Sequence, residues 1–172
     1  MATTTPNNGW PVPTSTDYVK DGATAIESLG DAIDTSVGEG LLAWQTWAPT
    51  LSAGWANGNG TWTARYAQLG KIVFAEGLFT VGSTTTKGTN LDISLPVNAQ
   101  ANALSSCVTT NTVGGAATYL LWFNLNAGTQ KLTCFAQSAS GSFVLRNNIT
   151  STVPATWATG DIVRFNITYE AE

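Results

Sequence analysis

The sequence predicts a mainly β protein: an antiparallel β-sandwich of jelly-roll-like type, preceded by an extended arm and a short N-terminal helix. Turns rich in glycine and asparagine separate eight or nine strand-like segments from Trp44 onward. One stretch with helical apolar periodicity precedes them. Charged residues make up only 10% of the chain, against about 25% in typical soluble domains. The surface must therefore be covered by Thr, Ser, Asn and Gly, or be partly buried against other subunits.

Residues 1–15 are expected to form an extended arm. Pro6, Pro11 and Pro13 disfavour helix and push the residues before them toward extended geometry. Trp10 lies among these prolines as a single large apolar side chain with no local partner. An arm of this composition is expected to lie on another surface.

A helix is expected over residues 16–37, within an oligomerisation and attachment segment that extends to residue 40. Thr16 is placed to cap the N-terminus of this helix with its hydroxyl group. Gly22 and Gly30 each cost about 1 kcal/mol of helix stability. A helix of this length and composition would be marginally stable alone in water.

An apolar stripe runs along the expected helix. Val19, Ile26 and Ile33 recur at intervals of seven residues, and Ala23, Leu29 and Val37 fill in the stripe. Such β-branched positions suit a short parallel bundle, and Ile there is compatible with a trimer. The alternative is a lone helix that packs on its own domain. We expect a homotrimer whose seam contains Val19, Ile26, Leu29 and Ile33.

Residues 41–172 are expected to form the β-sandwich domain. Residues 61–67 alternate polar and apolar side chains, and a turn at 68–71 leads into a second long strand at 72–81. Further strands are expected at residues 91–95, 104–110, 117–125, 130–137, 142–146 and 161–169, with 44–51 as another candidate.

The net charge of −4 is unevenly distributed. Residues 1–40 carry six acidic residues against one lysine, which leaves five acidic and six basic residues in 41–172. No basic run exists, so a nucleic-acid partner is not expected. The N-terminus lacks the basic and apolar regions of a signal peptide, and no segment approaches the roughly 20 apolar residues of a membrane span. Membrane insertion is therefore not expected.

The residue types argue against a catalytic or metal site. The chain has no histidine, which removes the commonest general base, the commonest zinc ligand and every Ser-His-Asp arrangement. Cys107 and Cys134 cannot build a four-ligand structural zinc site by themselves, and buried thiols are favoured over a disulfide. No metal or other cofactor is expected.

A carboxylate pair remains conceivable, because Glu76, Asp92 and Asp161 could meet in space and cleave a glycosidic bond. However, Asp161 follows Gly160 and is better explained by a turn. Glu76 is better explained by a solvent-facing position or by an ion pair with a nearby cation. The protein is therefore not expected to be an enzyme.

The chain has seven tryptophans, and their positions differ in kind. Trp62 and Trp122 lie within strand patterns and are expected in the core. Trp55 and Trp157 lie in loops and are candidate glycan contacts, because an exposed ring offers a large contact area at low entropic cost. The alternative for both is that the rings fix their own loops.

Both ends of the chain resemble a known group of proteins. The leader NNGWPVPTSTDYVKDGATAIESLGDAID resembles the N-terminal leader of many tail-fibre-like and other surface proteins of tailed phages, notably those infecting actinobacteria. The pattern W-x-x-W-x-P-T-L at residues 44–51, followed by NGTWTARYAQLGKIVFAEGLFTVGSTTT, is similar to the opening of their β-sandwich domains. The ending PATWATGDIVRFNITYEAE is also similar to theirs, whereas residues 97–150 are less distinctive.

The resemblance implies a structural virion protein, often a homotrimer, whose N-terminal part faces the particle and whose sandwich is displayed outward. It implies arm contacts at Trp10, Pro11 and Pro13, and it carries no catalytic residues. The expected partners are other copies of the chain, phage tail or capsid proteins, and a host cell-surface glycan. Such a protein is made in the host cytoplasm and located on the virion surface.

The function expected from these observations is a tail-fibre or receptor-binding protein that contacts the host surface. The alternative is a capsid decoration or head-fibre protein bound to the outer shell, and a more remote one is a cell-wall glycan hydrolase. The leader occurs on proteins with different places on the particle, so it does not distinguish tail from capsid.

Overall fold

The computed structural model describes residues 3–6, 8–16, 18–40, 43–100, 106–108, 111–113, 117–126, 130–140 and 143–172. The chain divides into two compact units, Met1–Ala43 and Trp44–Glu172. The expected arm and helix belong to the first unit and the expected β domain forms the second. Each unit is described by itself.

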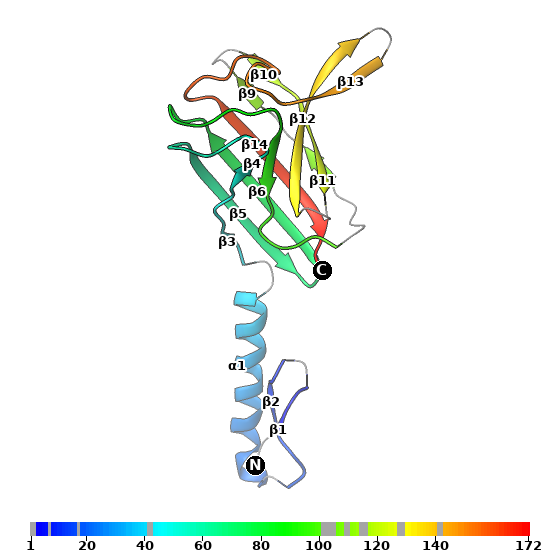
Figure 1. The fold of residues 1–172 in the computed structure, drawn as a ribbon. Coiled ribbons are helices and arrows are strands. Elements are labelled where there is room, and N and C mark those ends of the chain that lie inside the picture. Colours follow the sequence, from blue (N-terminus) through cyan, green and yellow to red (C-terminus); the bar gives the residue numbers. More distant parts are fainter. Residues whose placement is uncertain are drawn as a thin grey trace. The chain divides into compact units, whose positions relative to one another are not determined.

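The first unit contains a small hairpin and a helix. Strands β1 (Thr3–Thr4) and β2 (Pro11–Val12) pair antiparallel, so the arm is extended as expected but turns back on itself. A short 3₁₀ turn, η1 (Val19–Asp21), leads directly into the helix α1 (Gly22–Gly40). The hairpin lies beside α1 (Figure 1).

The helix does not begin with the expected cap. Tyr18 precedes the first turn, and its side chain makes no capping hydrogen bond. The Thr16 hydroxyl instead lies 3.0 Å from that of Thr14. The prediction of Thr16 as N-cap is therefore wrong, because the helical geometry begins only at Val19.

The second unit is mainly β, and its paired strands are antiparallel. Its strands are β3 (Gln45–Thr46), β4 (Leu51–Ser52), β5 (Thr61–Leu69), β6 (Ile72–Thr80), β7 (Leu91–Ser94), β8 (Ser106–Val108), β9 (Asn111–Val113), β10 (Ala117–Tyr119), β11 (Leu121–Asn126), β12 (Lys131–Ser140), β13 (Phe143–Asn148) and β14 (Ile162–Glu170).

These strands form two sheets (Figure 1). The seven-stranded sheet has the order β10-β9-β14-β6-β5-β3, with β8 also paired to β14. The five-stranded sheet has the order β11-β12-β7-β4, with β13 paired to β12. The prediction of a mainly β, antiparallel fold is confirmed.

Both sheets contribute to one hydrophobic core. Alternate residues of β14 are buried, as are alternate residues of β12, which gives each strand an inner and an outer face. The inner side chains belong to a single cluster that includes Val73, Phe165 and Ile167 from one sheet and Ile93 and Leu132 from the other. Two sheets that share one core are consistent with the expected β-sandwich.

One expected strand is divided between the two sheets. Residues 117–125 were expected to be continuous, but they form β10 in the seven-stranded sheet and β11 in the five-stranded sheet. Leu120 lies between the two strands. Alternation alone does not show where a chain passes from one sheet to another, because both strands keep the same side-chain period.

Close packing fixes the side chains at the centre of the seven-stranded sheet. Phe165 of β14 is paired with Gly77 of β6. A Cβ atom at Gly77 would lie 2.7 Å from the Phe165 ring, so only glycine leaves room for that ring. Trp62 and Trp47 also contact Phe165 edge-on, which places the expected core residue Trp62 against the cluster.

Tyr169 near the end of β14 connects two distant segments. Its hydroxyl donates to the Val97 carbonyl at 2.7 Å and accepts from the Val97 N–H at 3.3 Å. Tyr169 is 1% exposed. Burial raises the pKa of Tyr169 to about 12 from an ordinary value of 10.0, although the hydrogen bond to Val97 opposes the shift.

The raised pKa of Tyr169 predicts a loss of stability at alkaline pH. The unfolded chain releases the phenolic proton near pH 10.0, whereas the folded chain holds it to about pH 12. The stabilising contribution is therefore complete below pH 10.0 and declines as pH rises toward 12. Urea unfolding at a series of alkaline pH values should show that Tyr169→Phe weakens this decline. The exposed Tyr18 provides the control Tyr18→Phe, which should retain it. An unchanged decline in Tyr169→Phe would contradict the prediction.

Candidate functional site

The first unit exposes an apolar stripe. Val19, Ile26 and Ile33 are 97%, 64% and 36% exposed, although each is a large apolar side chain. Ala23, Gly30 and Val37 are also exposed and lie between or beyond them. The six residues are spaced alternately by four and three positions, which is the spacing of a coiled-coil seam. We call Val19, Ala23, Ile26, Gly30, Ile33 and Val37 the seam.

The arm covers a different side of the same helix. Gly22, Ala25, Leu29 and Ala32 are half-buried and recur at helical spacing. Ser36 continues this side, and its hydroxyl oxygen accepts a 2.9 Å hydrogen bond from Trp10 Nε1. Strand β2 contacts α1. The chain therefore covers one side of its helix and leaves the seam uncovered within the unit.

The structure separates the four residues that were expected to form the trimer seam. Val19, Ile26 and Ile33 lie together on the exposed side. Leu29 is half-buried and lies seven residues before Ser36, on the side that faces the arm. Leu29 therefore does not belong to the seam. The residues at seam spacing that the expected set omits are Ala23, Gly30 and Val37.

The three expected arm contacts also differ from one another. Trp10 and Pro11 are half-buried, and Trp10 binds the chain's own helix through its indole N–H. Trp10 thus finds its side-chain partner 26 residues away, on the helix of the same chain, and not among its sequence neighbours. Pro13 is exposed, and so are Thr3 and Thr4 of β1. These positions, together with Pro6, Asn8, Gly9 and Ser15, are exposed residues of the described arm and are accessible to another protein.

The two tryptophans expected to contact glycans are buried. Trp55 and Trp157 are 3% and 4% exposed, and their rings pack edge-on with centroids 5.6 Å apart. Trp157 Nε1 also donates to the Val153 carbonyl at 3.1 Å. Neither ring face is accessible to a sugar, so the alternative explanation holds: the two rings fix their own loops against the core.

Trp122 is the most exposed of the seven tryptophans, at 58%. The prediction that it lies in the core is wrong. Leu121, Phe123 and Leu125 occupy the inner face of β11, so Trp122 projects outward with Asn124. The segment Leu120–Leu125 has apolar residues in both registers, and the sequence gives no sign of which register faces the core.

Glu76 and Asp161, two of the acidic residues considered for hydrolysis, bind structural partners, and the third, Asp92, lies on the other sheet from Glu76. Glu76 accepts a 2.6 Å ion-paired hydrogen bond from Arg65 Nε, and the Arg65 guanidinium also lies 4.4 Å from the centre of the Trp44 ring. Asp161 is 5% exposed and accepts a hydrogen bond from the Ala158 N–H at 2.6 Å, which shapes the turn before β14. Asp92 lies on β7, in the other sheet from Glu76.

Neither a metal cluster nor a spanning helix is found where the structure is described. Among those residues, no group of three or more His, Cys, Asp or Glu side chains could hold a metal ion. The same part of the chain contains no helix with the length and hydropathy needed to cross a membrane. Cys134 is fully buried in the core, whereas the side chain of Cys107 lies outside the described set.

Replacement of Trp10 tests whether this residue holds the arm on the helix. Trp10→Ala removes the hydrogen bond to Ser36 and the half-buried ring. The loss of about 1.4 kcal/mol of stabilisation raises the equilibrium constant for opening of the arm about tenfold. We expect backbone hydrogen exchange in residues 3–12 to become about tenfold faster or more, measured by mass spectrometry. The control is Thr35→Ala, an exposed neighbour of Ser36 that should leave exchange unchanged. Equal exchange rates in Trp10→Ala and wild type would show that Trp10 does not hold the arm.

Comparison of this chain with family models, curated proteins and solved structures finds no match.

Proposed function

We propose that this protein is a homotrimeric structural protein of a phage virion, of the tail-fibre or receptor-binding type. Its N-terminal unit joins three copies and attaches them to the particle, while the β domain is displayed toward the host surface. The observation that supports assembly is the uncovered seam beside a helix face that the chain covers itself. The assignment to a virion rests on the resemblance of the leader and of both ends of the β domain to phage surface proteins.

Burial of the seam would offset the weakness of the helix. Burial of a large aliphatic side chain stabilises by about 1.5–3 kcal/mol, and the seam contains Val19, Ile26, Ile33 and Val37 in each copy. Gly30, in the interior of α1, destabilises the helix by about 1 kcal/mol relative to alanine. Association through the seam therefore supplies stability that the isolated helix lacks.

The arrangement of the seam favours a trimer over a dimer. The four-then-three spacing places Val19, Ile26 and Ile33 at d positions and Ala23, Gly30 and Val37 at a positions. Parallel dimers favour Leu at d with Ile or Val at a, whereas trimers and tetramers are favoured by Ile at d together with Ile or Leu at a. The seam shares with the second group Ile at two d positions and has no Leu at d. The small residues at two a positions permit the helices to approach closely.

The seam predicts that assembly onto the particle depends on two isoleucines. The double substitution Ile26→Asp and Ile33→Asp places a charge at two d positions, where trimer formation would bury it at high cost. We expect phage that carry this variant to lose most of the protein from purified particles, measured by immunoblot. The β domain should keep its fold, because the seam belongs to the other unit.

A matched control carries the same added charge outside the seam. Thr24 and Thr35 are exposed on α1 at positions away from both the seam and the arm, so Thr24→Asp with Thr35→Asp should leave incorporation near wild type. Wild-type incorporation of the Ile26→Asp, Ile33→Asp variant would contradict the proposed role of the seam.

Copy number distinguishes a tail location from a capsid location. We expect a handful of trimers per virion, measured by quantitative mass spectrometry against the major capsid protein. Copy numbers comparable to the symmetry sites of the capsid would instead identify a shell decoration protein. Absence of the protein from purified virions would overturn the proposed function.

A further inference from the structure

The outer face of the five-stranded sheet carries an exposed aromatic residue, Trp122, in a row with a second ring and several polar residues. The register pairs Trp122 of β11 with Phe135 of β12, and Phe135 with Asn148 of β13. These three residues therefore form one row across the sheet. The next row on the same face pairs Gln137 with Arg146. On the other side of the aromatic row, Asn124 is paired with Thr133.

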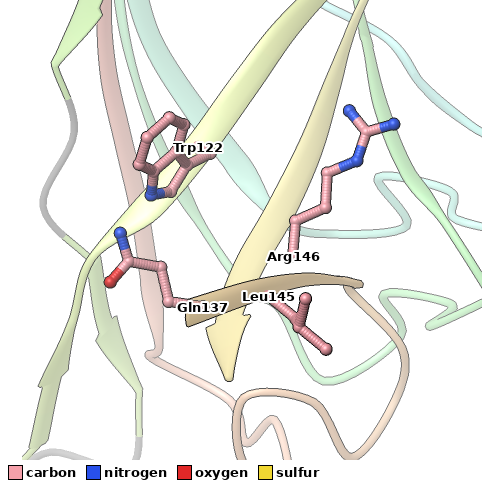
Figure 2. A pocket seen from close by; sticks show the side chains of 4 residues that line it. All are labelled: Trp122, Gln137, Leu145 and Arg146. Atoms are coloured by element: carbon pink, nitrogen blue, oxygen red, sulfur yellow. The ribbon is translucent and has the colours of Figure 1, made fainter. Parts of the chain in front are cut away.

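A hollow of about 670 Å³ lies at this face. It is lined by Trp122, Gln137, Leu145 and Arg146, and Figure 2 shows the Gln137 side chain extending toward the indole of Trp122. Trp122 and Leu145 are 58% and 53% exposed, so both are accessible to a ligand. The volume is within the range of small-molecule sites, about 300–1,000 Å³, which combine apolar walls with a few polar groups.

A cation–π contact positions Arg146, the cation among the described residues that line the hollow. The guanidinium carbon of Arg146 lies 4.5 Å from the centre of the Phe135 ring. Guanidinium groups stack on aromatic faces, and their N–H donors lie in the plane of the group, where a ligand can accept from them. Arg146 is therefore partly ordered before any ligand binds, which lowers the entropic cost of using its paired donors.

We propose that this hollow binds a saccharide, with one sugar ring stacked on Trp122. The C–H face of a pyranose ring is apolar and fits the exposed indole, while its edge carries hydroxyl groups. The Gln137 amide both donates and accepts hydrogen bonds, and the paired donors of Arg146 fit two adjacent hydroxyl groups or a carboxylate. Leu145 borders the hollow, but it pairs with Ser138 and precedes Arg146, so its side chain belongs to the opposite face of β13.

The surroundings favour a saccharide over a protein partner. The core of a protein interface is enriched in aromatic and other large apolar residues over about 800 Å² on each side. Around Trp122 the outer face presents one further ring, Phe135, which Arg146 covers, and the polar residues Asn124, Thr133 and Asn148. Two rings in one row, Trp122 and the Arg146-covered Phe135, are bordered by amides and a hydroxyl, which matches a ligand that combines an apolar ring face with many hydroxyl groups.

This proposal deepens the proposed function by naming the ligand class and the site, and it rests on that function only for the natural source of the glycan. Binding is measured on purified full-length protein, whereas virion assembly is measured by incorporation and copy number. Either result can therefore fail without the other.

The test is saturation-transfer NMR with four probes: maltotriose, lactose, triacetylchitotriose and trigalacturonic acid. We expect wild-type protein to transfer saturation to the ring C–H protons of at least one probe, with Trp122→Ala lowering the affinity about tenfold or more. Arg146→Met keeps the length of the side chain and should lower the affinity severalfold. Preference for trigalacturonic acid would indicate that Arg146 binds a carboxylate, and preference for the other probes would indicate hydroxyl groups.

The control is Trp44→Ala. Trp44 is 48% exposed, but it lies beside Arg65 of the seven-stranded sheet and not at the hollow. This variant should bind like wild type. An unchanged melting temperature of Trp122→Ala would show that the fold is retained, as expected for an outward side chain. Failure of wild type to bind all four probes, or equal affinity of Trp122→Ala and wild type, would overturn the proposal. Loss of self-association in Trp122→Ala without any sugar binding would indicate that a second copy of the chain covers this face.

Discussion

The N-terminal unit buries only one side of its helix and leaves the apolar seam in contact with water. The proposed assembly follows from this constraint. The arm packs along α1 and binds Ser36 through Trp10. It leaves Ile26 at 64% exposure and Val19 at 97%. Large apolar side chains in this arrangement lower the free energy of the system when they leave water. An identical helix from another copy presents the same surface and fits the same spacing.

The β domain meets the same constraint within one chain. Val73, Ile93 and Ile167 are 0% exposed, and both sheets contribute to one core. This domain therefore needs no helix for its own packing. The helix is explained if several domains must be joined and held at one place, because linked weak contacts bind far more tightly than single ones when the geometry permits simultaneous engagement.

Alternation and turn composition predicted most strands of the β domain, since residues such as Val73 and Ile167 must face inward at every second position. Surface placement was less predictable. Trp122 lies in a segment where both registers are apolar, so only the completed sheet decides that its ring faces outward. Trp55 lies in a glycine-rich loop, yet the loop folds inward and its ring contacts Trp157.

The helix shows the same limit. The helical period was visible in the sequence. However, the sequence alone does not decide whether Leu29 or Ile26 lies on the exposed apolar side, because that depends on where the arm packs. The arm places Leu29 on the covered side and leaves Ile26 exposed. Contacts between segments distant in sequence therefore decided which of two apolar sides became the seam.

Association through the seam is tested most directly by the mass of the wild-type protein, measured by sedimentation equilibrium over a wide range of concentrations. An uncovered seam of this spacing predicts a species with the mass of three chains, which dissociates only on strong dilution. A single-chain mass at every concentration would contradict the seam as an association surface. A stable two-chain mass would keep association but contradict the trimer.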